Sequence, residues 1–116
     1  RFHVLYCAPA AVIDNWMQTP ADHRKAAEDK MMQDWKAWMG AHASLFADPG
    51  AGVGKTKRVT AQGVADARND IMLYAIVEAE SHEAAARAFK DHPHFGIPQA
   101  SIDVMPLSAL PDAPRK

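Results

Sequence analysis

The densest group of titratable side chains lies in residues 91–94, Asp91-His92-Pro93-His94. Pro93 restrains the backbone, so the two imidazoles are held in a nearly constant relation. Imidazoles beside a carboxylate can transfer protons or bind a ligand. We therefore expect His92 or His94 to be a catalytic base and Asp91 to orient it. The structural alternative is that both histidines cap the end of a helix.

Metal binding by these histidines is a further alternative. A zinc site needs three or four protein ligands, and with three of them a water molecule completes the coordination. The chain has one cysteine and no HExxH-like pair, so the remaining ligand would have to be supplied by folding alone, from Asp91, His3, His42 or Asp103. We expect neither a metal nor another cofactor.

Two polar side chains interrupt apolar strand-like segments. Tyr74 lies in the middle of Ile71–Val77, and its hydroxyl group needs a polar core partner or a cavity. Asp103 alternates with Ile102 and Val104, which directs its carboxylate to the opposite face of the strand. Asp103 is expected in solvent or a dimer interface, or as a general base in a cavity between two sheets, with Tyr74 as a hydrogen-bond donor to substrate.

Trp35 and Trp38 share a helical face with Met31 and Met39. Large side chains at this spacing form a core or a substrate-binding platform. Cys7 lies within a strand and is expected to be an inert buried thiol.

The segment Gly50-Ala51-Gly52-Val53-Gly54-Lys55-Thr56 resembles a phosphate-binding loop. That motif needs a glycine at position 49, where this chain has Pro49, and a helix after the lysine. The residues that follow Lys55 are instead typical of a strand. A glycine-rich turn with a basic tip is the simpler interpretation.

Composition limits the classes of function. The 116 residues suffice for one domain, and 13 basic against 14 acidic residues give a net charge of −1, which argues against nucleic-acid binding. No apolar run approaches the roughly 18 residues of a membrane span. With a single cysteine and no secretory-signal pattern, we expect a cytoplasmic protein without membrane contact.

The elements that must position these side chains alternate in type. Strands are predicted at residues 2–8, 57–61, 71–77 and 101–107. Helices are predicted from Pro20, after a Thr19 N-cap, to residues 40–43, and from Ser81 to residues 91–93. Residues 8–18, 46–57 and 63–70 are expected to be connections, and residues 108–116 a loose tail.

This order, β-α-β-β-α-β, predicts one α+β domain over residues 1–116 of the ferredoxin-like kind. It has a four-stranded antiparallel sheet with two helices on one face. The first and third strands are apolar on both sides, so the uncovered face is expected to pack against a copy of itself. We therefore predict a homodimer.

Several segments resemble the YCII-related (DGPF-like) family: residues 5–9, 35–38, 74–85, 90–95 and 101–107. The resemblance covers nearly the whole chain and implies a dimeric α+β barrel. In that family a histidine near the start of the first helix is suggested to act with an aspartate. Thr19-Pro20-Ala21-Asp22-His23 resembles its context with the histidine displaced by one, which points to His23.

For the aspartate of that dyad, Asp34 lies about 16 Å further along the same helix, so Asp91 is the better partner for His23. The D-G-P-F string itself is absent, and a few relatives are lyase- or dehydrochlorinase-like enzymes on aromatic substrates.

Two functions remain open. One is a cofactor-independent, His-assisted lyase or hydrolase that acts on a small metabolite, with an aromatic or carbonyl group, in the barrel cavity. The other is a non-catalytic dimeric ligand-binding or accessory protein. A catalytic histidine should be partly exposed in a concave site beside a carboxylate, whereas a capping histidine should bond to the backbone.

Overall fold

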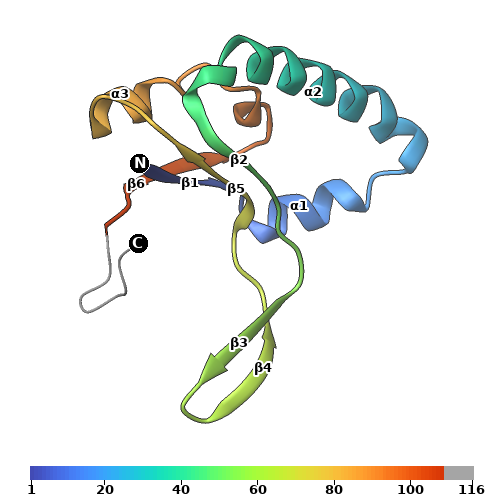
Figure 1. Cartoon of the computed structure of the whole chain (residues 1–116). Helices are drawn as coiled ribbons and strands as arrows, with labels where there is room; N and C mark the ends of the chain where they lie inside the picture. The colour runs from blue at the N-terminus through green and yellow to red at the C-terminus, as the bar shows by residue number, and fades with distance from the viewer. Residues whose placement is uncertain (109–116) are drawn as a thin grey trace.

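The computed structural model describes residues 1–108, which form an α+β fold (Figure 1). The strands are β1 (Phe2–Cys7), β2 (Phe46–Gly52), β3 (Thr56–Thr60), β4 (Gly63–Ala67), β5 (Ile71–Val77) and β6 (Ser101–Pro106). The helices are α1 (Ala10–Met17), α2 (Ala21–Ala41) and α3 (His82–Arg87), with short 3-10 helices η1 (Ala43–Leu45) and η2 (Pro93–Gly96). Of the expected tail, residues 109–116 lie outside the described range.

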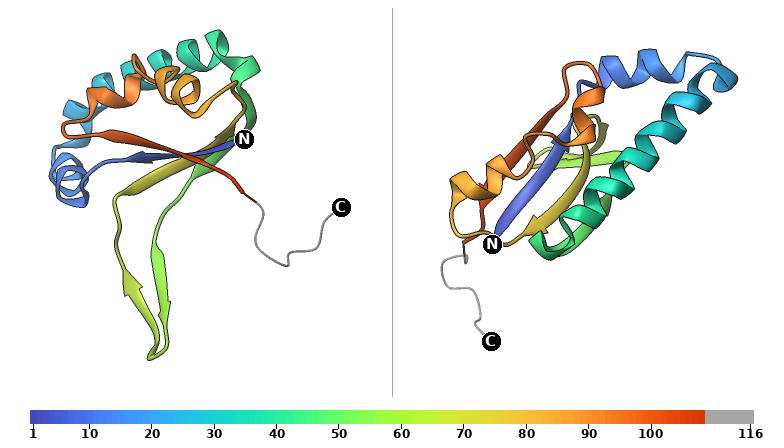
Figure 2. Two further views of the ribbon diagram at one scale, coloured as in Figure 1. Left: turned by 90° about the vertical axis from the view of Figure 1, so that its left-hand side faces the viewer. Right: turned by 90° about the horizontal axis from the view of Figure 1, so that it is seen from above.

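The main sheet has four antiparallel strands in the order β2-β5-β1-β6. α2, α3 and η2 lie over one face, and the opposite face carries no helix (Figure 2). Alternation in β1 explains this layering, since Phe2, Val4 and Tyr6 are buried while the residues between them are half-buried. In the described residues no helix combines the length and apolarity needed to cross a membrane.

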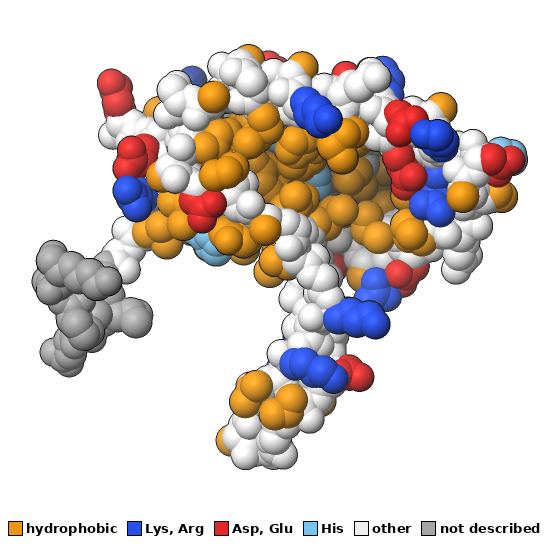
Figure 3. All heavy atoms as spheres, turned by 45° about the vertical axis from the view of Figure 1, so that its right-hand side comes forward, with side chains coloured by type: hydrophobic (Ala, Val, Ile, Leu, Met, Phe, Trp, Pro, Cys, Tyr) orange, Lys and Arg blue, Asp and Glu red, His pale blue; other side chains and the backbone are white. Residues whose placement is uncertain are grey.

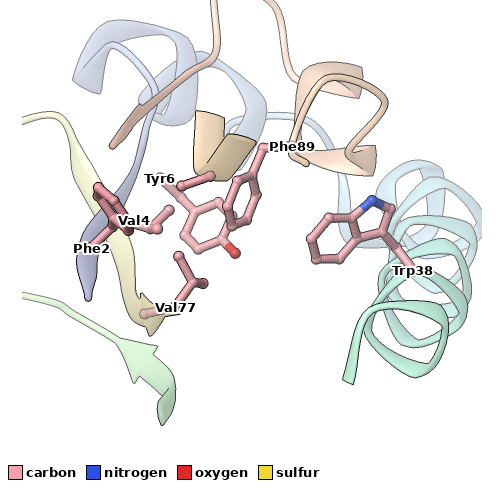
Figure 4. Close-up of a cluster of buried hydrophobic side chains, with 8 residues drawn as sticks. Phe2, Val4, Tyr6, Trp38, Val77 and Phe89 are labelled. Atoms are coloured by element: carbon pink, nitrogen blue, oxygen red, sulfur yellow. The ribbon is translucent and has the colours of Figure 1, made fainter. Parts of the chain in front are cut away.

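The core lies between the sheet and the helices, as Figure 4 shows. Trp38 of α2 and Phe89, which follows α3, stack with ring centroids 5.2 Å apart and an interplanar angle of 29°. Phe89 also meets Tyr6 of β1 edge-on at 6.0 Å. These contacts attach both helical segments to the central strands.

The sequence predicted β1, β5 and β6 to within a residue, as well as the long helix α2. Ser81 caps α3 as expected, accepting a hydrogen bond from the Ala84 N–H at 3.0 Å. At α2 the N-cap is Pro20 and not Thr19, and no side chain caps it.

Residues 8–18 were expected to be a loop, which is wrong, because Ala10–Met17 form α1. Pro9 precedes the helix, where its missing N–H costs nothing, and Asp70 Oδ1 accepts from the otherwise unpaired Ala10 N–H at 3.1 Å. Arg68, which follows β4, forms a bidentate ion pair with Asp14, with N–O distances of 2.6 and 2.8 Å. Val12, Ile13, Trp16 and Met17 recur at helical spacing, and contacts from residues distant in sequence stabilise the helix.

The strand next to β5 was also assigned to the wrong residues. Phe46–Gly52, expected to be a turn, forms β2, whereas the expected strand at 57–61 belongs to a separate hairpin. Gly50 makes this possible, because its φ of +78° brings the backbone so close to Tyr74 that a Cβ would lie 1.7 Å from the Tyr74 carbonyl oxygen.

β3 and β4 pair with each other and with no strand of the main sheet. The connection expected at 63–70 is therefore wrong as well, since its first half is a strand. Thr60 Oγ1 accepts from the Gln62 N–H, and Gly63 has a φ of +130°, which together form the tight turn. We call residues 56–67 the arm; it projects away from the rest of the chain (Figure 1).

Candidate functional site

His92 and His94 lie inside the molecule, beneath α2. After α3 the chain turns through hydrogen bonds from the Lys90 N–H to the Arg87 carbonyl and from the His92 N–H to the Phe89 carbonyl. His92 is then the N-cap of η2, and Pro93 begins that helix. His92 and His94 are 2% and 0% exposed, respectively. The pair therefore belongs to the core and not to an exposed loop.

Each imidazole is bonded to the backbone. His92 Nδ1 accepts from the His94 N–H at 2.9 Å, and His94 Nε2 donates to the Cys7 carbonyl at 2.8 Å. These bonds place the proton of neutral His92 on Nε2 and that of neutral His94 also on Nε2. Within residues 1–108, His92 Nε2 and His94 Nδ1 are buried without a hydrogen-bond partner.

Aromatic rings surround His92. The ring centroids of Trp38 and Trp35 lie 4.3 and 4.4 Å away, and that of Tyr6 lies 5.1 Å away. Trp35 meets the imidazole nearly edge-on, at 83°. A weak N–H contact to an aromatic face is the interaction that such surroundings offer to the Nε2 proton.

Both histidines are neutral at pH 7. Burial, followed by the nearby His94 and His42, lowers the pKa of His92 to about 4. Burial also lowers the pKa of His94, and the backbone of Cys7 and Ser101 opposes this effect. A buried imidazole of low basicity is a poor proton acceptor, because desolvation disfavours its charged form.

The structure does not bring the expected carboxylates to these rings. Asp91 is exposed, although it directly precedes the buried His92. His23, in the first turn of α2, has a 70% exposed side chain, and its Nε2 lies 4.0 Å from Asp22 Oδ2 and forms no ion pair with Asp91. The expected His23–Asp91 dyad is therefore not assembled in this chain.

A second set of polar groups lies on the sheet face without helices. Leu5 of β1 is the register partner of Tyr74 in β5 and of Asp103 in β6, so these three side chains form one row across the sheet. His3 shares the face, with its ring centroid 6.0 Å from that of Tyr74. We call His3, Leu5, Tyr74, Ile76, Asp103 and Met105 the open face.

The three residues expected to bind substrate are divided between the two faces. Tyr74 is half-buried, and its register with Leu5 and Asp103 puts it on the open face. Trp38 is buried on the helix side of the sheet, and Trp35 is half-buried beside it. The two tryptophans form part of the core around His92.

Cys7 lies on the same side of the sheet as the open face, next to it in β1, and is half-buried. Burial raises the pKa of its thiol, and the negative charges of Asp103 and Asp70 raise it further. The raised pKa keeps the thiol protonated at neutral pH, which makes it a poor nucleophile. The expectation that Cys7 is buried is wrong, because the side chain is half-buried on the face without helices.

His3 belongs to the open face, whereas the sequence pointed to it only as a possible metal ligand. The alternation of β1 already separated His3, Leu5 and Cys7 from the buried set. The register between β1 and β5, which places His3 beside Tyr74, could not be read from the sequence. Among residues 1–108, no group of three or more His, Cys, Asp or Glu side chains could hold a metal ion.

A cleft of about 680 Å³ lies where the arm joins the sheet, between α1, the β2–β3 loop and the end of β4. Lys55, Lys57 and Arg68 line it. Arg68 is paired with Asp14 and Lys57 with Asp66. The residues after Lys55 form a strand, so this segment lacks the helix N-terminus that a phosphate-binding loop needs.

Comparisons with protein-family models, with curated proteins and with solved structures found no match to this chain.

Proposed function

We propose that this protein is a homodimer of the dimeric α+β-barrel kind, resembling YCII-related proteins, and that it binds a small molecule between its two sheets without using His92 or His94 as catalytic bases. The observation that carries the proposal is the open face. It combines apolar side chains with three polar groups and has no helix over it.

The strand order supports a ferredoxin-like subunit. With β1, β2, β5 and β6 counted as the first to fourth strands, the order is that of two interleaved βαβ units, with the helices on one side. Such a subunit covers only one face of its sheet. Pairing two open faces about a twofold axis would form the barrel.

The accessible surface supports a partner. The chain exposes 8449 Å², whereas a folded monomer of 12.7 kDa exposes about 6,200 Å². The chain therefore exposes about 2,200 Å² more than a compact monomer of its mass. A standard protein interface buries about 800 Å² on each partner.

The open face indicates the chemistry of the ligand. Leu5, Ile76 and Met105 offer apolar contacts. The Tyr74 hydroxyl group and the His3 imidazole can donate hydrogen bonds, and the Asp103 carboxylate can accept one. Closing the interface would concentrate these groups in a largely apolar cavity, the usual form of a small-molecule site. A small aromatic compound with a carbonyl group matches this set.

The surroundings of the histidines favour binding over catalysis. His92 and His94 are almost fully buried, and each is bonded to the backbone. The pKa of His92 is lowered to about 4. A general base needs access to the proton that it removes and a pKa near the working pH. These are the properties expected of structural histidines.

Saturation-transfer NMR with benzaldehyde, a small aromatic carbonyl compound, tests the ligand part of the proposal. We expect transfer from the protein to benzaldehyde, with about tenfold weaker binding for Tyr74→Phe, which loses one hydrogen bond. Asp29→Asn, on the exposed surface of α2, is the control and should bind as the wild type does. Equal binding by Tyr74→Phe, or no transfer in the dimer, would contradict the proposal.

A further inference from the structure

The arm has no packing partner among the strands of the main sheet. β3 and β4 pair only with each other over Thr56–Thr60 and Gly63–Ala67. The radius of gyration is 16.5 Å, against about 13 Å for a compact domain of this length. A two-stranded hairpin in water is at best marginally stable. The arm therefore needs a surface to pack against.

One face of the arm is apolar near the tip. Val59 and Val64 are direct register partners, so their side chains lie together on one face, and they are 74% and 68% exposed. Figure 3 shows apolar side chains gathered near the end of the arm. Lys57 and Asp66 share that face and form an ion pair, so it carries no net charge. A neutral apolar face suits a protein partner and not a nucleic acid.

The direction in which the arm projects indicates where its partner lies. The arm leaves the end of β2 and projects to the side of the sheet opposite the helices (Figure 2). That is the side of the open face. A second copy seated on the open face would therefore lie alongside the arm, and twofold symmetry would place the second arm against the first copy.

We propose that the arm clasps a second copy of this chain and that Val59 and Val64 pack against it. This inference rests on the proposed homodimer and adds a contact outside its sheet interface. It also accounts for the surface that the isolated chain exposes in excess. The two arms are equivalent, so each substitution acts twice in the dimer.

Sedimentation equilibrium of the full chain tests the inference. The double variant Val59→Thr/Val64→Thr keeps β-branched side chains, and hence strand propensity, but replaces a methyl group with a hydroxyl group at each position. We expect its dimer dissociation constant to rise by at least about tenfold. Ala65→Ser, on the opposite face of the arm, is the control and should associate as the wild type does.

Hydrogen exchange provides a second measurement on the same proteins. Amides of residues 56–67 should be more protected at protein concentrations above the dissociation constant than below it. A dimer that is equally tight in the double variant and the wild type would overturn the clasp and leave the proposed function standing. Equal weakening by Ala65→Ser would also overturn it. A wild type that is monomeric at every concentration would overturn both.

Discussion

Acid should destabilise this protein through His92. The pKa of His92 is lowered from 6.5 to about 4 in the folded state, mainly by burial. Well above pH 6.5 the ring is neutral in the folded and the unfolded state, so its titration does not change the free energy of unfolding. Between pH 6.5 and 4 the unfolded chain takes up a proton that the folded chain does not, so stability falls with decreasing pH. The full effect, reached below pH 4, is about 3 kcal/mol.

The choice of a control variant depends on the groups that surround His92. Trp35 and Trp38 of α2, Tyr6 of β1 and the rings of His94 and His42 surround it. His94 has a lowered pKa and acts in the same direction. His92→Asn removes the titrating ring but keeps an acceptor for the His94 N–H, so the difference between the two proteins isolates His92.

Urea unfolding between pH 7.5 and pH 4.5, at one fixed protein concentration, measures this effect. The free energy of unfolding of the wild type should fall more steeply with acid than that of His92→Asn, by about 1 kcal/mol per pH unit between pH 6 and 4.5. Parallel curves for the two proteins would refute the claim that His92 is held neutral in the core.

Three smaller predictions follow from local geometry. Gly50→Ala should disrupt the pairing of β2 with β5, because the new Cβ would lie 1.7 Å from the Tyr74 carbonyl oxygen; Gly54→Ala, where nothing lies within 4 Å, should leave the melting temperature unchanged in calorimetry. Ser81→Ala should lower the free energy of unfolding by about 1 kcal/mol through loss of the α3 N-cap, whereas Ser44→Ala should not. Asp103→Asn should lower the pKa of Cys7 by removing a negative charge, so that a disulfide reagent reacts faster at pH 8; an unchanged rate, or an equal change in Asp29→Asn, would contradict this assignment.

The sequence predicted the elements whose residues share a period or a cap. β1, β5 and β6 have apolar residues on the helix side of every strand, and α3 begins at a serine cap. β2 could not be predicted, because Pro49 and Gly50 are typical of turns. Only the pairing with β5 shows that position 50 needs glycine for its close approach to Tyr74. Helix α1 depends on Asp70 and Arg68, which are distant in sequence.

Strand alternation also predicts which face of the sheet a site residue lies on. Alternation alone placed Asp103 on the face opposite Ile102 and Val104, and the structure has that arrangement. The position of His92 depends on how the turn after α3 folds beneath Trp35 and Trp38, which no local pattern encodes. Histidine is a polar residue that is common in loops. Here, hydrogen bonds to the backbone and aromatic neighbours make His92 and His94 part of the core.

The molecular mass in solution tests the central proposal most directly. Sedimentation velocity of the wild type should give a species of about 25 kDa, twice the chain mass of 12.7 kDa. Leu5→Glu, at the centre of the open face, should give the chain mass with unchanged helix content, because facing carboxylates would repel across the twofold axis. Met32→Glu, at an exposed methionine of α2, should remain a dimer. A wild type at 12.7 kDa over the whole concentration range, or a Leu5→Glu variant that still dimerises, would contradict the account.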